Sequence, residues 1–312
     1  MTADLYLGLD IGGTKIELAA CDATLAVVHR QRIATPAADF DDFVAQVTAL
    51  VNDAEAASGQ RATAVGLGMP GIVDTVSGCQ LSSNVPALNG RRVAPALTAA
   101  LGRPVHMGND CQCFALSEAQ GGAADGLPSM FGAILGTGAG GGFCVGGRLV
   151  AGYNGLAGEW GHWPVPAALL LRHDLPLLPC PCGLRGCLER YVSGTGLATL
   201  YQLRATSPQP AADAAAVNAL AAQGDEGAVE ALALHLDLLA QGLAGLVLAL
   251  DPHAIVLGGG LSKLQRLYDE LPAAMARHLF SGACVPPLLP PRFGDAGGAR
   301  GAALLARQRS GG

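Results

Sequence analysis

Three cysteines and one histidine lie close enough in the sequence to bind one metal ion. They are His162, Cys180, Cys182 and Cys187. Zn²⁺ favours four thiolate and imidazole ligands in a tetrahedron, and such a closed set leaves no position open for water. The set therefore predicts a structural zinc ion. Buried cysteines without a metal are the simpler alternative, because the spacing is not that of a zinc finger.

The same stretch carries two carboxylates that a metal ion would fix in place. Glu159 precedes His162 by three residues, and Glu189 follows Cys187 by two. A zinc ion that joined the two loops would hold both acids in defined positions. Glu159 and Glu189 are therefore candidate ligands for substrate hydroxyl groups.

A glycine-rich hairpin near the start of the chain could hold phosphate. It joins strands expected over 5–10 and 16–21, and its turn residues are Gly12, Gly13, Thr14 and Lys15. The string from Gly8 to Lys15 is not a P-loop, because Thr14 and Lys15 stand in reverse order and a strand follows instead of a helix. Free N–H groups, a hydroxyl and a lysine still suit phosphate oxygens, and Asp10 suits Mg²⁺. A plain hairpin turn is the alternative.

A second glycine turn is expected over 136–142, between strands over 130–135 and 143–145. Its residues include Gly136, Thr137, Gly138, Gly140, Gly141 and Gly142. They match GxGxxG, but a Rossmann site needs a helix directly after the glycines. Two hairpins of similar form indicate two related halves facing one nucleotide. A third turn, with Gly259 and Gly260 after a strand over 254–257, offers bare backbone to a base or ribose, with close helix packing as the alternative.

Polar residues also follow two other strands. Asn109 and Asp110 stand between a strand that starts at Val105 and a helix expected over 111–120. Open α/β sheets bind ligands at such strand ends, although Asp110 is equally suited to be an N-cap. Ser83 and Asn84 lie in a loop over 82–86, where they could reach a ligand or serve turn chemistry.

The remaining pattern predicts a mixed α/β chain. Helices are expected over 39–57, where apolar residues recur at helical spacing, over 227–250, from Leu261 onward, and at the end of the tail. The segments 121–128 and 208–216 look like connections, the first between domains. The C-terminal helix is expected to pack back on the first domain.

Composition excludes several classes of protein. The chain has 312 residues, 19 basic and 25 acidic side chains, a net charge of −6 and no basic run. These values argue against nucleic-acid and anionic-membrane partners. We expect no signal peptide and no apolar run long enough to span a membrane. Nine cysteines without a regular framework predict reduced thiols and a cytoplasmic location.

Several motifs together resemble the ROK family of bacterial sugar kinases. They are DIGGTK from Asp10, GMPG from Gly68, ND at Asn109, GTGAGGG from Gly136, GEWGH from Gly158, CPCGLRGCLE from Cys180 and GGG from Gly258. They cover nearly the whole chain in the family's order. Within the family, SSNVPALNG, NDCQCFALSEA and GDAGGARGAA are similar to the N-acetylglucosamine kinase branch, as is the long insertion between His162 and Cys180.

The resemblance implies the actin and hexokinase type of fold, with two ribonuclease-H-like domains and the active site in the cleft between them. We expect residues 1–120 with a helix over 298–312 to form the first domain, and 121–297 to form the second, with the zinc site. It also implies ATP with Mg²⁺ and a structural Zn²⁺. The implied reaction is ATP-dependent 6-phosphorylation of N-acetyl-D-glucosamine.

The resemblance assigns roles residue by residue. Asp110 matches the general base that takes the proton of the sugar hydroxyl. Asn109, Glu159, His162 and Glu189 match the family's sugar ligands, and the predicted sugar site also includes Asp110, Gly71, Ser83 and Asn84. Asp10, the turn Gly12, Gly13, Thr14 and Lys15, and the turn Gly136, Thr137, Gly138, Gly140, Gly141 and Gly142 match its ATP and Mg²⁺ sites. The predicted ATP site also includes Gly8, Gly259 and Gly260.

Two alternatives remain open from sequence. A kinase for glucose, N-acetylmannosamine, fructose or another hexose would use the same hydroxyl ligands. The family also includes sugar-sensing transcriptional regulators, but these carry a DNA-binding segment before the first strand, and only four residues precede Leu5 here. Family members are often dimers, so a homodimer is compatible with the sequence.

Overall fold

The computed structural model describes residues 4–81, 85–207, 212–294 and 297–311. The chain forms two compact units, each built from several stretches. Unit 1 contains residues 1–128, 142–157 and 292–312, and unit 2 contains 129–141 and 158–291.

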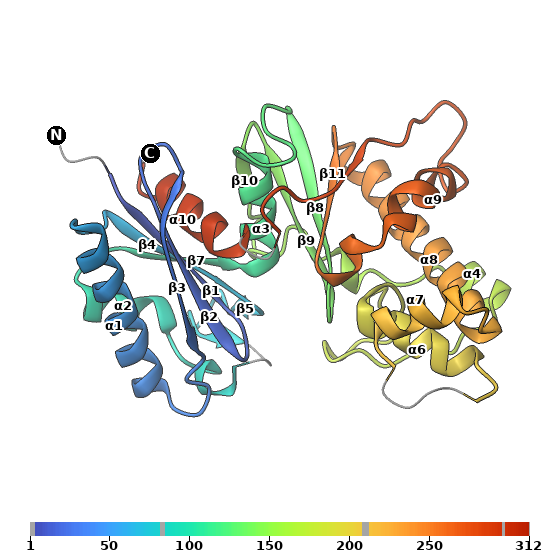
Figure 1. Cartoon of the computed structure of the whole chain (residues 1–312), viewed down its shortest axis with the longest axis horizontal. Coiled ribbons are helices and arrows are strands. Elements are labelled where there is room, and N and C mark those ends of the chain that lie inside the picture. Colours follow the sequence, from blue (N-terminus) through green and yellow to red (C-terminus); the bar gives the residue numbers. More distant parts are fainter. Residues whose placement is uncertain (1–3, 82–84, 208–211, 295–296, 312) are drawn as a thin grey trace. The chain divides into compact units, whose positions relative to one another are not determined.

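Unit 1 is built on a five-stranded sheet of order β3-β2-β1-β4-β7 (Figure 1). Its strands are β1 (Tyr6–Ile11), β2 (Lys15–Cys21), β3 (Val27–Ala34), β4 (Ala64–Met69) and β7 (Val105–Asn109). The first three strands pair antiparallel, and β4 and β7 run parallel to β1. The carboxyl ends of β1, β4 and β7 therefore meet at one edge, which brings the residues after Asp10, Met69 and Asn109 near one another.

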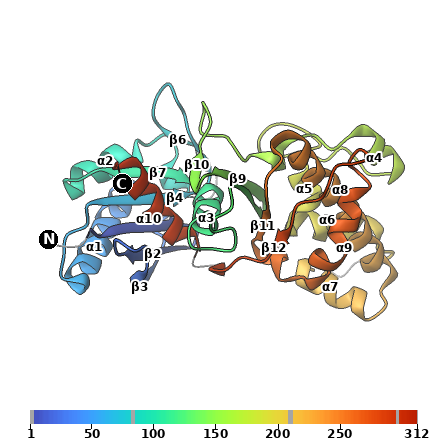
Figure 2. The same cartoon turned by 90° about the horizontal axis from the view of Figure 1, so that it is seen from above.

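Alternation along β1 gives the sheet two different faces. Leu5, Leu7, Leu9 and Ile11 pack in a core with the helices α1 (Phe40–Ser58) and α2 (Val93–Leu101). Tyr6 packs on the other face with Ala303 and Ala306 of α10 (Gly297–Arg309). Figure 2 shows α10 lying across these strands beside α3 (Asp110–Ala119).

Local signals fix the ends of α1. The Asp39 side chain accepts a hydrogen bond from the Asp42 N–H, which is the expected N-cap arrangement. Gly59 follows the helix with φ +68°, a left-handed conformation that ends helices and that other residues rarely adopt. The expected helix over 39–57 is confirmed to within one residue at each end.

A second five-stranded sheet has the order β10-β9-β8-β11-β12. Its strands are β8 (Ser129–Leu135), β9 (Ala139–Val145), β10 (Arg148–Val150), β11 (Ile255–Gly258) and β12 (Leu288–Leu289). β11 runs parallel to β8 and β12, while β9 and β10 form an antiparallel hairpin. The boundary between the two units falls within β9, after Gly141.

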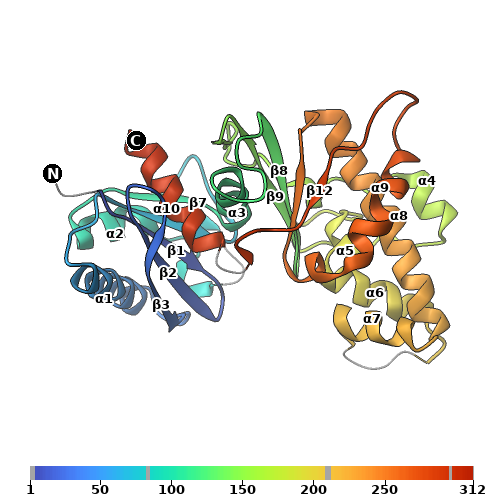
Figure 3. The same cartoon turned by 45° about the horizontal axis from the view of Figure 1, so that its top comes forward.

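The helices of unit 2 gather around α8 (Figure 3). They are α4 (Ala167–Arg172), α5 (Glu189–Val192), α6 (Gly194–Arg204), α7 (Ala214–Ala222), α8 (Glu226–Leu250) and α9 (Gln265–Ala276). Short 3-10 turns are η1 (Pro86–Leu88) in unit 1 and η2 (Trp160–His162) and η3 (Gly260–Lys263) in unit 2. A small hairpin of β5 (Ile72–Val73) and β6 (Gln80–Leu81) completes unit 1.

Three expectations about the elements are wrong. The sequence predicted no apolar run long enough to span a membrane, but α8 is long and apolar enough by length and composition. Within the structure, 67% of its apolar window is buried, as in a helix of a protein core. The turn expected over 136–142 ends at Gly138, because β9 begins at Ala139. The connection expected over 208–216 includes the start of α7 at Ala214, where the Asp213 carboxylate accepts the Ala216 N–H as an N-cap.

Candidate functional site

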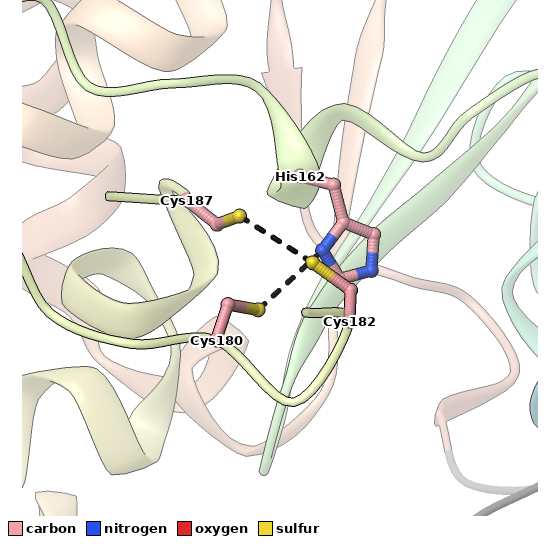
Figure 4. Close-up of side chains that lie close together, drawn as sticks. All are labelled: His162, Cys180, Cys182 and Cys187. Atoms are coloured by element: carbon pink, nitrogen blue, oxygen red, sulfur yellow. Dashed lines mark hydrogen bonds between the residues drawn. The ribbon is translucent and has the colours of Figure 1, made fainter. Parts of the chain in front are cut away.

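The four predicted zinc ligands come together in unit 2 (Figure 4). Their ligand atoms all lie within 4.8 Å of one another. Cys180 Sγ is 3.7 Å from His162 Nδ1, and Cys182 Sγ is 3.7 Å from Cys187 Sγ. A tetrahedron with Zn–S bonds of about 2.3 Å places its sulfurs about 3.8 Å apart, so this set fits zinc.

The chemistry of the thiols also fits a cation. Burial, followed by the neighbouring Cys182 and Cys180 thiols, raises the pKa of Cys187 to about 12. The Cys187 thiol therefore resists ionisation on its own. A zinc ion binds the thiolate form and reverses that preference.

Tight packing positions His162 within unit 2. The Trp160 side chain is buried, and its Nε1–H donates to the Gly140 carbonyl at 2.8 Å. Gly161 approaches the strand so closely that an added Cβ would lie 2.0 Å from the Ala139 carbonyl oxygen. Trp160 and Gly161 therefore fasten the turn that carries Glu159 and His162 to β9. The sequence motif contained both residues, but their types alone did not reveal this contact.

The two predicted acidic sugar ligands are held differently. Glu159 Oε2 lies 3.7 Å from His162 Nε2, the ring nitrogen that faces away from the thiols. Glu189 Oε2 accepts the Ala139 N–H at 3.0 Å, and Oε1 lies 3.9 Å from Cys180 Sγ. Both carboxylates thus adjoin the cysteine and histidine cluster, as the spacing predicted.

The turn at Gly136–Gly138 meets two further elements of unit 2. The Gly194 N–H, at the first position of α6, donates to the Gly136 carbonyl at 2.7 Å, and the Thr195 hydroxyl donates to the Thr137 carbonyl at 2.8 Å. Gly259 also packs against the start of the turn, where an added Cβ would be 2.5 Å from the Leu135 carbonyl oxygen and 2.8 Å from the Gly136 nitrogen. The turn therefore lies beside the positive end of a helix dipole, which favours phosphate.

Not all the glycines near this turn are free for a nucleotide. A Cβ on Gly138 would lie 2.6 Å from Glu189 Oε2. Gly141 lies in β9, and a Cβ there would be 2.5 Å from the Gly132 carbonyl oxygen. Gly142 packs on α3. Close packing within the fold is thus a sufficient reason for glycine at 141 and 142.

The first glycine hairpin, in unit 1, is tied to β3. The Gly12 N–H donates to the Lys15 carbonyl at 2.9 Å, and the Thr35 hydroxyl donates to the Gly12 carbonyl at 2.7 Å. Thr14 and Lys15 are exposed at its tip. Gly8 lies in the middle of β1, where a Cβ would be 2.0 Å from the Ala299 carbonyl oxygen of α10. Helix packing is therefore a sufficient reason for glycine at position 8.

Two carboxylates of unit 1 have raised pKa values. Burial, followed by the charge of Asp110, raises the pKa of Asp10 to about 7. Burial also raises the pKa of Asp110, against the opposing hydrogen bond from the Cys111 N–H. Neighbouring carboxylates that share a poorly solvated place suit a divalent cation, which stabilises their ionised forms.

Asp10 also adjoins a residue that sequence reasoning missed. A Cβ on Gly298 would lie 2.3 Å from Asp10 Oδ2, so the first turn of α10 needs glycine to approach this carboxylate. The glycine pair in the closing GDAGGARGAA motif was the available signal. Nothing in its local pattern pointed to Asp10, which lies nearly 290 residues away in the chain.

Asn109 and Asp110 have different positions at the start of α3. Asn109 is the N-cap, because its Oδ1 accepts the Cys111 N–H at 2.8 Å, while its Nδ2 donates to the Gly71 carbonyl at 3.4 Å. Asp110 is the first residue of the helix, so the N-cap reading of Asp110 is wrong. Asn109, Asp110 and Gly71 are thus neighbours, whereas Ser83 and Asn84 lie outside the described residues.

The candidate residues therefore form two groups, each within one unit. Unit 1 holds the hairpin at Gly12–Lys15, Asp10, Asn109, Asp110 and Gly71. Unit 2 holds the turn at Gly136–Gly138, Glu159, Glu189, Gly259, Gly260 and the four predicted zinc ligands. The first group suits Mg²⁺, phosphate and proton transfer, and the second suits zinc, phosphate and hydroxyl binding.

Comparison with solved structures defines the fold class. A ROK hexokinase from Thermus thermophilus superimposes with a TM-score of 0.87 at 32% sequence identity, covering 98% of this chain and 99% of that one. The chain therefore has the two-domain, actin-like fold of ribonuclease-H type.

Comparison of sequences then identifies the family. The ROK family model matches residues 6–309. N-acetylgalactosamine kinase AgaK of Shewanella sp. (strain ANA-3) is 48% identical over 301 residues, 96% of each protein. An N-acetyl-D-glucosamine kinase of Aliivibrio salmonicida (strain LFI1238) is 42% identical, over 96% of this chain and 99% of that protein. The chain belongs to the ROK family, as its motifs predicted.

Proposed function

We propose that this chain is an ATP-dependent sugar kinase that phosphorylates the 6-hydroxyl of N-acetyl-D-glucosamine. The names of its relatives and their near-complete coverage support a sugar kinase. The observation that carries the proposal is the pair at the start of α3. Asn109 caps the helix, which leaves the carboxylate of Asp110 for chemistry.

In this proposal Asp110 is the general base. A sugar hydroxyl is too weakly acidic to ionise at neutral pH, so a carboxylate must orient it and accept its proton as the bond to phosphorus forms. Burial raises the pKa of Asp110, which strengthens it as a base once it is ionised. Asn109 and the Gly71 backbone hold the neighbouring position and suit hydroxyl binding.

The phosphate ligands come from both glycine turns. Bound ATP would supply the phosphoryl group and Mg²⁺ would neutralise the charge that develops on it. Asp10 suits the cation directly or through water, and Lys15 and Thr14 are exposed beside it. The N-terminus of α6 beside Gly136–Gly138 adds a second site for phosphate oxygens.

In this proposal a structural zinc ion holds the sugar ligands of unit 2 in position. His162 would bind the metal through Nδ1, which faces the thiols, and present Nε2 to a hydroxyl group beside Glu159. Glu189 is oriented by the Ala139 N–H. The zinc would carry out no chemical step, and the protein atoms would orient the sugar.

N-acetyl-D-galactosamine is a second candidate substrate, because the AgaK relative has the higher identity of the two reported above. The two sugars differ only in the orientation of the 4-hydroxyl. A panel of N-acetylglucosamine, N-acetylgalactosamine, N-acetylmannosamine, glucose and fructose with ATP, read by coupled ADP formation, decides between them. We expect the highest kcat/KM for N-acetylglucosamine. A preference for any other sugar of the panel would contradict that substrate while leaving the kinase activity in place.

We further propose a cytoplasmic enzyme without a nucleic-acid or membrane partner. All nine cysteines lie in the described part of the chain and carry free thiols, and the net charge is −6. Retardation of duplex DNA by the protein at low salt would contradict the first point. Sedimentation equilibrium would distinguish a monomer from the homodimer that is common in the family.

A further inference from the structure

Gln112 and Glu118 are buried polar side chains of α3 that have no part in the proposed chemistry. Gln112 is 4% exposed and Glu118 is fully buried at 0%. Removing an amide and a carboxylate from water is unfavourable unless their polar atoms form hydrogen bonds. The partners of Gln112 and Glu118 therefore indicate what the two residues do.

Both side chains bind backbone groups far away in the sequence. Gln112 Nε2 donates to the carbonyl oxygens of Gly155 at 3.0 Å and Ala157 at 3.1 Å. Glu118 accepts three N–H groups: Oε2 from Ala123 at 2.8 Å and Arg292 at 3.0 Å, and Oε1 from Phe293 at 3.1 Å. A side chain that forms hydrogen bonds with backbone groups fixes the path of the main chain at those residues.

The segments they hold are those in which the chain passes from one unit to the other. The chain changes unit after residues 128, 141, 157 and 291. Ala157 is the last residue before the third passage, and Arg292 is the first residue after the fourth. Ala123 stands five residues before the last residue of the first stretch.

The remaining passage is fixed to the same helix by packing. Gly142 is the first residue after it, and a Cβ there would lie 2.9 Å from Gln112 Cα and 2.8 Å from Ala115 Cβ. Each of the four connecting segments thus has a contact with α3 inside unit 1. The first residue of the same helix is Asp110.

We propose that α3 anchors all four connections between the units, and that Gln112 and Glu118 are positioning residues for phosphoryl transfer. Their side chains hold three of the four connecting segments to the helix that bears Asp110, and the packing of Gly142 holds the fourth. A shift of about 1 Å in the path of such a segment misplaces reacting groups and lowers the rate by about 10²-fold.

The helix supplies a matched control for the test. Gln120, at the end of α3, also donates its side-chain amide to a backbone carbonyl, that of Gly147 at 2.6 Å. Gly147 belongs to the turn between β9 and β10. Gln308 donates to the same Gly147 carbonyl at 2.9 Å, so this carbonyl keeps a side-chain donor when Gln120 is replaced. Gln112→Met and Gln120→Met therefore remove the same chemical group from one helix, but only the first takes the side-chain donor away from a connecting segment.

The kinetic test compares these two variants. We expect Gln112→Met to lower kcat about 10-fold or more while KM for sugar and ATP and the melting temperature stay close to those of Gln120→Met. Gln120→Met should keep the kcat of the unaltered protein. Equal kcat in the two variants, or a change in KM alone for Gln112→Met, would overturn the positioning role.

A second measurement tests the anchor without using activity, since the kinetic test rests on the proposed kinase function. Glu118→Gln keeps the size of the side chain, but it replaces one carboxylate oxygen by an NH₂ donor and removes the negative charge that strengthens all three hydrogen bonds. In native-state hydrogen exchange we expect the amides of Ala123, Arg292 and Phe293 to exchange at least about 10-fold faster in this variant, with the amides of α1 unaffected. Unchanged protection at all three positions would refute the anchor. A protein that phosphorylates no sugar would instead refute the proposed function, and the exchange result would still stand.

Discussion

At the scale of single residues, neighbouring side chains in the sequence have separate tasks. Asn109 and Asp110 are adjacent, yet the first closes the end of a helix and the second is left with a buried carboxylate. His162 shows a similar division within one ring, because Nδ1 faces the thiols and Nε2 faces Glu159. Single substitutions can therefore test each role separately.

Replacement of Asp110 by asparagine should separate binding from turnover. The amide keeps the size of the side chain and can still bind a hydroxyl group, but it cannot accept the proton. We expect kcat to fall by about 10² to 10⁴-fold, with the sugar affinity close to that of the unaltered protein. Steady-state kinetics and calorimetric titration with sugar measure the two quantities. Turnover near that of the unaltered protein would remove Asp110 from its proposed role.

Replacement of Cys182 by serine should lower zinc affinity and sugar binding together. Elemental analysis of chelator-free protein should find one zinc per chain, and the variant should lose at least about 10-fold in zinc affinity and show a higher KM for sugar. Cys284→Ser is the control, because Cys284 is also exposed and lies outside the cluster. Equal zinc content and KM in both variants would argue against a metal at this place.

At the scale of elements, the close packing of α10 explains why small residues recur in unit 1. Glycines of two strands and of the helix itself allow close contact between backbones. A Cβ would lie 1.8 Å from the Ala302 carbonyl oxygen at Gly66, and 1.7 Å from the Cys113 carbonyl oxygen at Gly301. The same helix presents Gly298 to Asp10, so its packing also positions this carboxylate.

Replacement of Gly301 by alanine should force α10 away from α3. The extra methyl group meets a backbone atom that cannot rotate away, and overpacking of this kind costs about 1–3 kcal/mol or more. Urea unfolding should show a lower midpoint. Gly260→Ala is the control, because no atom of the described residues lies within 4 Å of an added Cβ there. Equal midpoints for the two variants would contradict the packing argument.

At the scale of the whole molecule, a buried histidine links stability to pH. His235 of α8 is 2% exposed, and its Nε2 lies 2.9 Å from the Val192 carbonyl oxygen. Burial lowers the pKa of His235 from 6.5 to about 4. The unfolded chain therefore binds a proton between these values while the folded chain does not, so its contribution is complete above pH 6.5 and is lost as the pH falls toward 4.

Replacement of His235 by glutamine should flatten this pH dependence. Glutamine can still donate to the Val192 carbonyl but does not titrate. We expect the unfolding free energy of the unaltered protein to fall by about 3 kcal/mol more than that of the variant between the two pKa values. Urea unfolding at several pH values measures both curves. Parallel curves would mean that His235 is not held neutral by burial.

The sequence by itself determined most of the elements and which residues are candidates for the sites. The predicted zinc ligands, the glycine turns and the Asn-Asp pair at a strand end are local patterns, because residue type and short spacing limit what they can bind. Hydrophobic periodicity determined α1 and α8 for the same reason. The family motifs then gave the fold class.

Only the tertiary structure decided which groups meet and why particular glycines are needed. Gly298 reaches Asp10, Gly161 reaches Ala139, and Glu118 reaches Arg292 and Phe293, each across a sequence separation with no local signal. The turn predicted after Leu135 was also too long, because β9 begins at Ala139. A glycine that is needed for a turn cannot be distinguished in the sequence from a glycine that is needed for a close backbone contact. Contacts of this kind depend on how elements pack, and packing is a property of the whole chain.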